Sequence, residues 1–339
     1  MSLRIQQLRL IPLFFFFLPA WVHAGFSSLL WDNDLFSPRN TDAYYTNGFL
    51  YHHVSDPVPQ ETGRHWKSCP GLSFLAKTAE PLLIRTGEAS QYRHSWGFGQ
   101  IIQTPSDLTL NPPDPDDQPY AGLLYGSCGF HVQEDGYAES MGLMLGVVGP
   151  LSLAERTQDI AHRVTGSEYP QGWDHQLANE PVLNLVYDRQ RVMTDFSVDG
   201  HSIKIFNNFG FAFGNLMIST TAGVNALFAK NTRAAFSLRP NFLGRYPWLS
   251  QSQPLGFYAL GSVQGMAVGR NLFLDGNTFE DGPSVDKEYV VGSGQLVMGY
   301  GFSCLALQLG LNLSTRTFKT QGESWPRYGT LGIVWGCSP

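Results

Sequence analysis

The sequence predicts an antiparallel transmembrane β-barrel of about twelve strands with a short helix in an outer loop. Only 15% of the 339 residues are charged, whereas 13% are aromatic and 36 are glycine, a combination that is unusual for a soluble enzyme of this size. After residue 25 no apolar run approaches the roughly 18 residues that a spanning helix needs. Instead, segments of about ten residues alternate in polarity between turn signals, as membrane strands do. A secreted β-sandwich shares this alternation and is the alternative.

Residues 1–24 have the form of a secretory leader. Arg4 and Arg9 precede an apolar run over residues 10–17, and Val22-His23-Ala24 resembles a cleavage site. We therefore expect 1–24 to be a signal peptide and 25–339 to form one outer-membrane barrel domain. Removal of the leader takes the net charge from −6 to −8. This acidic balance argues against nucleic acid as a partner.

Twelve segments are expected to be strands, and an even number is typical of bacterial barrels. The clearest is 303–315, where leucines at every second position alternate with small or polar residues. Such a strand would place leucine toward lipid and the other residues toward the lumen. The twelve segments are 26–33, 44–54, 92–103, 120–132, 137–148, 182–193, 202–213, 216–228, 256–268, 289–301, 303–315 and 328–336.

The strand order also predicts which connections share one side of the membrane. If the chain begins at the periplasmic side, connections that follow odd-numbered strands lie outside the cell. This would place 32–43, 104–119 and 149–181 outside. The long segments 55–91 and 229–255 would then be periplasmic, against the usual pattern of short periplasmic turns.

Four cysteines, Cys69, Cys128, Cys304 and Cys337, lack the short paired spacings of a zinc site. In an exported chain they are expected to form disulfides. Cys304 begins the eleventh predicted strand and Cys337 follows the twelfth, so both would lie near the same rim of adjacent strands. Cys304 with Cys337 is therefore the first pairing that we predict, and Cys69 with Cys128 the second.

One well-marked helix interrupts this series of strands, within residues 146–180. Ser152 and Glu155 have the spacing of a capping box, and Gly166 provides a left-handed stop, so about three turns are expected. Spacing divides this helix into two faces. We expect the more apolar face to pack and the other to present chemistry, although a solvated histidine is the plainer interpretation. The first face holds Leu153, Thr157, Ile160 and Val164, and the second holds Glu155, Gln158 and His162.

Three outer segments, 31–34, 41–48 and the helix, are rich in polar residues and are expected to converge. Carboxylate and amide oxygens of Asn33 and Asp34 are ligands that suit Ca²⁺. A neutral histidine opposite such an ion, His162, can deprotonate water while the ion polarises a carbonyl and stabilises its oxyanion. Such a combination suits attack of water on a carbonyl group.

Several motifs resemble those of the outer-membrane lipid A 3′-O-deacylases, and the resemblance extends over most of the mature chain. The most specific part is the helix segment, whereas the later strands are similar only as generic barrel strands. The motifs are Asn33-Asp34, Tyr45-Thr46-Asn47-Gly48, Asp117-Gln118-Pro119-Tyr120-Ala121-Gly122, and GVVGP followed by Gln158, Ala161-His162-Arg163 and Gly172-Trp173-Asp174-His175-Gln176.

The resemblance implies a twelve-stranded barrel whose site lies between the wall and a helix from an outer loop, facing the cell exterior. It implies Ca²⁺-dependent removal of the 3′-linked acyloxyacyl group of lipid A, a lipopolysaccharide component, by a monomer surrounded by outer-membrane lipid. By position, His162 would be the general base, with Gln158 one helical turn away. Asn33, Asp34 and Thr46 would surround calcium and substrate, and Glu168 would be a further site and metal residue.

One departure from the family concerns a site lysine in the outer loop after the third strand. The segment 104–110 contains no lysine. Arg163 and Arg93 are candidates to replace it. The departure keeps a phospholipid esterase open as an alternative, and a non-enzymatic channel or surface protein is the competing class.

Overall fold

The computed structural model describes residues 25–37, 43–57, 90–134, 136–230 and 256–336. The predicted leader, most of segments 55–91 and 229–255, and the residues Cys69 and Cys337 lie outside these ranges. Cys128 and Cys304 are both disulfide-bonded. Because their proposed partners are not among the described residues, the two pairings stay predictions.

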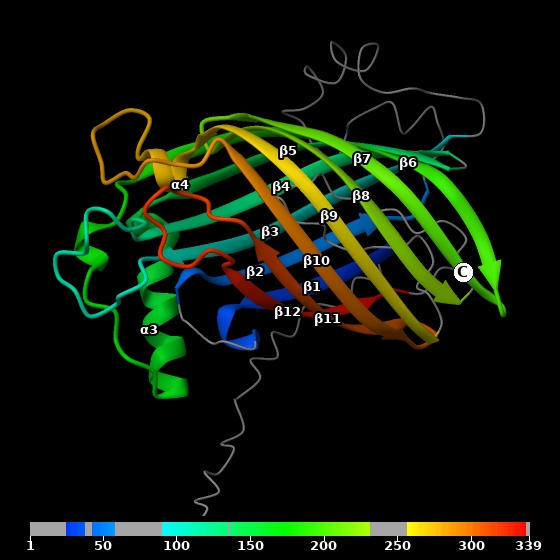
Figure 1. The fold of residues 1–339 in the computed structure, drawn as a ribbon, viewed down its shortest axis with the longest axis horizontal. Coiled ribbons are helices and arrows are strands. Elements are labelled where there is room, and N and C mark those ends of the chain that lie inside the picture. The colour runs from blue at the N-terminus through cyan, green and yellow to red at the C-terminus, as the bar shows by residue number, and fades with distance from the viewer. Residues whose placement is uncertain (1–24, 38–42, 58–89, 135, 231–255, 337–339) are drawn as a thin grey trace, which may run out of the picture.

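Twelve antiparallel strands form a closed barrel in which each strand pairs with its neighbours in the chain and β1 pairs with β12 (Figure 1). This confirms the predicted fold class and strand number. Closure leaves no strand edge unpaired. The strands are β1 (Gly25–Asn33), β2 (Tyr44–Ser55), β3 (Gln91–Thr104), β4 (Ala121–Glu134), β5 (Tyr137–Val148), β6 (Glu180–Val198), β7 (His201–Gly214), β8 (Met217–Lys230), β9 (Gly256–Asn271), β10 (Val290–Gly301), β11 (Leu305–Ser314) and β12 (Arg327–Trp335).

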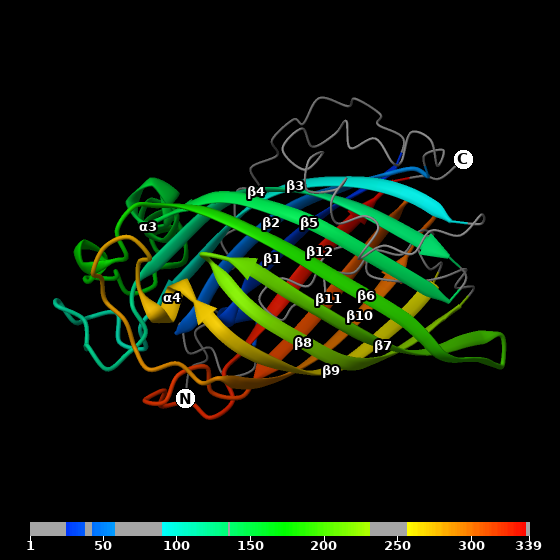
Figure 2. The ribbon, with the colours of Figure 1, turned by 90° about the horizontal axis from the view of Figure 1, so that it is seen from above.

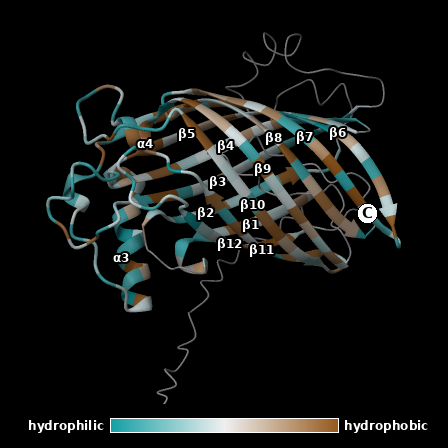
Figure 3. Cartoon of the chain, viewed as in Figure 1, coloured by the Kyte–Doolittle hydropathy of each residue, from teal (hydrophilic) through white to brown (hydrophobic). Residues whose placement is uncertain are grey.

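The outer surface of the barrel is apolar, as the alternation predicts. In β11 the side chains of Leu305, Leu307 and Leu309 are exposed, whereas Ala306 and Gln308 are buried in the interior. Exposed aromatic and aliphatic side chains occur on other strands around the barrel. Hydrophobic colours accordingly run along the strands in Figure 3, while the loops at the end that carries the helix α3 are largely hydrophilic. Among the described residues, no helix is both long and apolar enough to cross a membrane.

Apolar side chains gather inside the barrel toward the end where β1 finishes. Leu177 from the β5–β6 connection and Leu272 and Phe273 from the short helix α4 (Leu272–Asp275) are fully buried. They join one hydrophobic cluster with inward side chains of several strands, including Leu123 and Met217. Elsewhere the interior holds buried polar side chains together with smaller apolar clusters, such as that of Phe26, Tyr258 and Ala306.

The hairpin of β6 and β7 extends beyond the strand that the alternation predicts, which ends at residue 193. The pairing continues past a β-bulge between Val192 and Thr194 to Val198. Asp199 and Gly200 then turn the chain with φ angles of 49° and 76°, a left-handed pair typical of tight hairpins. The added residues, 194–198, are all exposed, and the bulge shifts the alternation just before them, so the predicted strand stopped there.

The two ends of the barrel carry different connections. Gly25 pairs with Ser55, so the long segment after β2 leaves from the end where β1 begins. Helix α3 (Ala154–Thr165) lies at the opposite end, with the loop that follows β3 and the helix α4 (Figures 1 and 2). The predicted grouping of loops by side is therefore present in the fold.

Candidate active site on the outer wall

Helix α3 has the predicted length but not the predicted start. It contains twelve residues and ends at Gly166, whose φ of 76° is left-handed as expected. The N-cap is Leu153, also left-handed with a φ of 60°, and no side chain caps the helix. Ser152 instead ends a preceding 3-10 helix (Pro150–Ser152), because Pro150 starts a tight turn there. The capping-box prediction is wrong.

The two faces of α3 are also reversed relative to the prediction. Ala154, Gln158 and His162 are the buried residues of the helix. Ile160 and Val164 are 61% and 54% exposed, so the apolar face does not pack against the protein. The polar face packs instead because it meets the outer wall of the barrel.

The start of α3 is held tightly against β3 and β4. A Cβ atom on Gly122 would lie 2.2 Å from Ala154 Cβ and 2.2 Å from Ser152 Oγ, so only glycine permits this approach. The Gln100 amide donates a hydrogen bond to the Ser152 carbonyl at 2.7 Å. Ile102, which is fully buried, packs in one cluster with Ala154 and the returning loop. Sequence analysis placed Gly122 in a motif but gave it no role.

The imidazole of His162 is oriented by the backbone. Its Nδ1 hydrogen-bonds with the carbonyl oxygen of Glu168, just beyond the end of the helix. A carbonyl oxygen can only accept, so Nδ1 carries the proton, and the neutral ring has its basic lone pair on Nε2. His162 is 6% exposed. The geometry therefore sets the tautomer that a general base requires.

Gln158 lies one turn before His162 and is also fixed. The Trp173 indole N–H donates to Gln158 Oε1 at 2.8 Å, and both side chains are buried. Among the residues that the structure describes, Gln158 Nε2 has no hydrogen-bond partner. Because the Trp173 N–H can only donate, the amide atom that it meets is the oxygen. The other terminal atom, Nε2, is therefore a donor. Sequence analysis did not foresee this pair.

The loop after β3 supports the chain that carries Trp173. Gln171 N–H donates to the Leu108 carbonyl at 2.8 Å, and the Trp173 and Tyr120 rings pack with centroids 4.9 Å apart. Within this loop, the hydroxyl and the N–H of Thr109 both donate to Asp107, and these hydrogen bonds lower the pKa of that carboxyl. The loop is thus internally braced and forms one side of the helix seat.

The strand register brings the other predicted site residues to the same part of the wall. Asn33 at the end of β1 pairs with Asn47, which pairs with Ile102, which pairs with Gly122. These four residues form one row across β1–β4, and α3 is seated on its Gly122 end. Two inter-strand spacings separate Asn33 from Ile102, or about 10 Å. A single substrate can therefore span from Asn33 to the helix.

Thr46 is placed in this row by an irregularity in β2. Tyr44 has a φ of 69°, rare for a bulky residue, and the register shifts between Tyr45 and Asn47. Thr46 is buried, and its hydroxyl lies 2.6 Å from that of Thr104. The buried Gln118 amide donates to the Tyr44 carbonyl at 3.0 Å and so supports the unusual backbone. Thr104 and Gln118 are residues that sequence analysis gave no role.

The predicted metal residues are arranged unequally. Asp34 is fully buried in a 3-10 helix (Asp34–Phe36), where one carboxylate oxygen accepts the Ala43 N–H at 2.7 Å. Asn33 is also buried, whereas Glu168 is exposed and contacts His162 through its backbone. The described residues contain no group of three or more His, Cys, Asp or Glu side chains that could hold a metal. An ion here would need amide, hydroxyl or backbone oxygens as well.

The two arginines proposed to replace the family lysine lie in different places. Arg93 is at the other end of the barrel, where its guanidinium donates to the Ser55 carbonyl at 2.8 Å and lies over the Phe26 ring. It is therefore not part of this site, because β3 runs away from α3 toward residue 91. Arg163 is on α3 and exposed.

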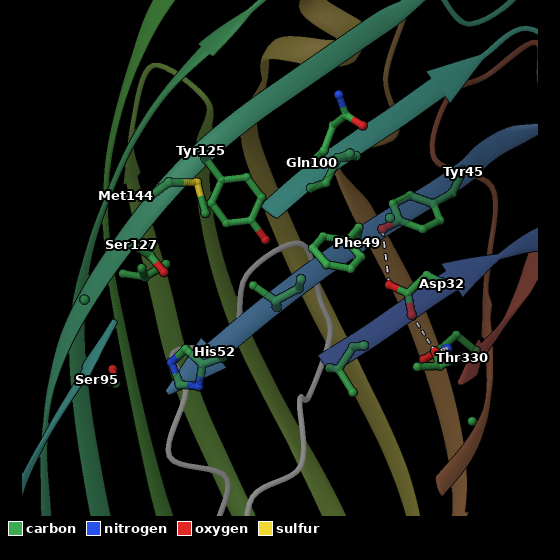
Figure 4. Close-up of a pocket in the computed structure, with 18 of the residues that line it drawn as sticks. Asp32, Tyr45, Phe49, His52, Ser95, Gln100, Tyr125, Ser127, Met144 and Thr330 are labelled. Carbon is green, nitrogen blue, oxygen red and sulfur yellow. Dashed lines mark hydrogen bonds between the residues drawn. The ribbon is translucent and has the colours of Figure 1, made fainter. Parts of the chain in front are cut away.

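A separate cavity of about 100 Å³ lies inside the barrel (Figure 4). Its lining comes from strands on several sides, among them β1–β6 and β10–β12, so it is part of the lumen. Asp32 accepts hydrogen bonds there from the Tyr45 hydroxyl at 3.2 Å and from Thr330 Oγ1 at 2.6 Å. Neither His162 nor Gln158 lines it. The cavity is therefore a feature of the interior, and Gln100 is the lining residue that also contacts the chain before α3.

The fold and the site together define a class: membrane β-barrels that carry a polar, histidine-containing site between the outer wall and a loop helix. The sequence model of the family described as "Outer membrane protein LpxR" matches residues 10–337. The chain belongs to this family of outer-membrane proteins.

Solved structures agree with the architecture. LpxR from Salmonella typhimurium superimposes with a TM-score of 0.69 at 19% sequence identity, covering 92% of this chain and 99% of that one. At this identity the similarity shows the fold. Two autotransporter barrels match with TM-scores of only 0.33 and 0.35: NalP from Neisseria meningitidis (7% identity, 92% of this chain, 88% of that one) and AIDA-I from Escherichia coli (8%, 96%, 94%). No curated protein sequence matches the chain.

Proposed function

We propose that the protein is a Ca²⁺-dependent esterase that removes the 3′-linked acyloxyacyl group of lipid A, with its site facing the cell exterior. The observation that carries the proposal is the buried His162, held by the Glu168 carbonyl as the tautomer that can accept a proton. Membership of the LpxR family supports it. A site outside the wall also suits a lipid that stays in the bilayer.

In this mechanism His162 is the general base. Nε2 takes a proton from a water molecule while the water oxygen attacks the ester carbonyl carbon. When the bond to the alcohol oxygen breaks, the imidazolium returns the proton to that oxygen, so that water and ester give an acid and an alcohol. The Nδ1–H bond to the Glu168 carbonyl persists and stabilises the imidazolium.

Gln158 has a second role in this mechanism. Its Nε2 is buried, and Trp173 fixes its direction through Oε1. A fixed amide N–H beside the base can donate to the substrate carbonyl or hold the attacking water. We assign Gln158 a positioning role: its N–H would hold either the substrate carbonyl oxygen or the attacking water.

The donors near Asn33 fit a hard cation. Asp34 supplies a buried carboxylate and Asn33 a buried amide, and Thr46 and Thr104 bring two hydroxyls beside the row of Asn33 and Ile102. All of these are oxygen donors, which Ca²⁺ prefers. Glu168 would add an exposed carboxylate from the helix side. When bound, calcium would polarise the ester carbonyl and stabilise the charge on its oxygen.

The barrel interior does not favour a channel. Leu177, Leu272 and Phe273 lie in an apolar cluster inside the barrel toward the end that carries α3, where a water-filled channel would be lined by polar side chains. Because the loop after β3 lacks the family lysine, Arg163 or another group would have to contact the phosphate of lipid A. A phospholipid ester is the alternative substrate.

The test is mass spectrometry of lipid A, and separately of phosphatidylethanolamine, after incubation with the purified protein in calcium or in chelator. Loss of one acyloxyacyl group from lipid A, abolished by chelator and by His162→Ala, is expected. His175→Ala is the matched control, since that histidine is exposed in the same loop and hydrogen-bonded to Asn111. If only the phospholipid is hydrolysed, the substrate is a phospholipid and not lipid A. If neither lipid is hydrolysed, the esterase proposal is overturned.

A further inference from the structure

The exposed face of α3 is more apolar than a water-facing helix surface requires. Leu153, Ile160 and Val164 are 48%, 61% and 54% exposed, and Leu151 just before the helix is 62% exposed. Residues 153, 160 and 164 share one side of the helix because they are spaced by seven and four. We name these four side chains the apolar stripe. No contact within the described protein covers it.

We propose that the apolar stripe is a membrane-docking surface that lies in the outer-leaflet lipid beside the barrel. The side chains of the barrel wall next to α3 indicate that lipid covers the stripe. Gly122, where α3 is seated, is an outward position of β4, and the next outward position is Leu124, which is 39% exposed. Phe98 and Leu145 on the neighbouring strands are 44% and 54% exposed. The stripe therefore continues the lipid-facing surface of the barrel.

The direction of α3 agrees with this placement. The helix stands upright in Figure 1, across the long axis of the molecule, and is seen nearly end-on in Figure 2. A membrane surrounds a barrel perpendicular to its axis, so α3 runs along the membrane surface and not through it. Helices that lie in the interface have this orientation, with one apolar and one polar side.

Charge along the stripe selects an anionic lipid surface. Arg156 and Arg163 are exposed and seven residues apart, so they share a face, and both adjoin Ile160 at helical spacings of four and three. Glu155 and Asp159 lie on the same side of the stripe as the arginines, between them and the buried face, and so farther from Ile160. Long arginine side chains beside an apolar stripe can reach phosphate groups while the stripe is immersed.

The experiment places a spin label on an added cysteine at residue 160 and measures its accessibility to oxygen and to a water-soluble nickel complex. The protein is reconstituted into vesicles of phosphatidylethanolamine with and without phosphatidylglycerol. Phe279→Cys, 74% exposed in the connection before β10, is the aqueous control, and Leu145→Cys is the lipid control. Mock-labelled native protein gives the background of the natural cysteines.

The label at residue 160 is expected to be accessible to oxygen and protected from nickel, at a depth of roughly 5–10 Å below the lipid phosphates. Combined Arg156→Gln and Arg163→Gln changes should remove any extra depth that phosphatidylglycerol gives. A label at residue 160 as open to nickel as that at 279 would overturn the proposal. Dipolar broadening between labels would do so too, because it would show a second copy of the chain on the stripe. These readouts do not depend on hydrolysis of any lipid.

Discussion

The Trp173 indole holds the Gln158 amide through a 2.8 Å hydrogen bond between two side chains that are both buried. Trp173→Phe keeps the ring packing on Tyr120 but removes this donor. The Gln158 amide can then rotate, and we expect kcat for ester release to fall roughly tenfold, the equivalent of one hydrogen bond of about 1.4 kcal/mol. Trp325→Phe, on an exposed tryptophan, is the control. An unchanged kcat for Trp173→Phe would show that the amide is held by other contacts.

Gly122 tests whether the seat of α3 is needed for activity. Gly122→Val places side-chain atoms where Ala154 and Ser152 now lie, so the helix must move off the wall. We expect activity to fall by about 100-fold or more, because a displacement of 1 Å can cost that much, while the barrel still shows heat-modifiable mobility in electrophoresis. Gly126→Ala is the control on the same strand, since the atom nearest to its added Cβ is 3.8 Å away. Full activity in Gly122→Val would contradict the site.

Glu168 contributes a backbone carbonyl to His162 and, in the proposal, a carboxylate to calcium, and these two contributions can be tested separately. Glu168→Gln removes the carboxylate but leaves the backbone carbonyl that orients His162. If the carboxylate helps to hold calcium, titration of activity with calcium should show half-maximal activity at a concentration raised by about tenfold, with little change at saturation. Glu155→Gln, exposed in the first turn of α3, should not shift the titration. A loss of rate at saturating calcium, with no shift, would instead assign the carboxylate to the substrate.

The seam between β1 and β12 offers a stability test inside the lumen. Thr330→Val removes the 2.6 Å hydrogen bond to buried Asp32 (Figure 4). We expect the free energy of unfolding to fall by about 1–3 kcal/mol, since a buried carboxylate loses a donor. Urea unfolding in detergent, followed by intrinsic fluorescence, measures this. Thr220→Val, on an exposed position of β8, should change it little.

The barrel was predictable because its pattern is local. Alternation in segments such as 137–148 predicted the bounds of the strand. The even number of strands then indicated a closed barrel, as the structure has. The 3-10 helices at Asp34–Phe36 and Pro150–Ser152 were not predicted, although Pro150 is a local signal for the second. The first lies against β12, and the second is held by Gln100 of β3, and both of these contacts are distant in the sequence. The length of β6 was missed because the bulge between Val192 and Thr194 interrupts the alternation just before its last residues.

The structure brings several of the predicted site residues to one part of the wall, but the residues that support them could not be predicted from the sequence. His162 and Gln158 share a helix face by spacing alone, yet the sequence favoured packing of the opposite, apolar face. Hydrophobicity points toward the core only when the surroundings are water. The register that aligns Asn33 with Ile102, and the bulge that places Thr46, follow from pairing between strands and could not be read from any one of them.

The candidate site lies on the outside of the barrel wall. This position determines how often the site and a lipid molecule would meet. Under the proposed function, a lipid substrate would reach the row from Asn33 to Gly122 from beside the barrel, by movement in two dimensions. The relevant concentration is then the number of substrate molecules per unit area of surface, not per volume of solution. Diluting the substrate with inert amphiphile should slow turnover even when total amounts are constant, and crowding of the β1–β4 sector by another protein would inhibit without contact with His162.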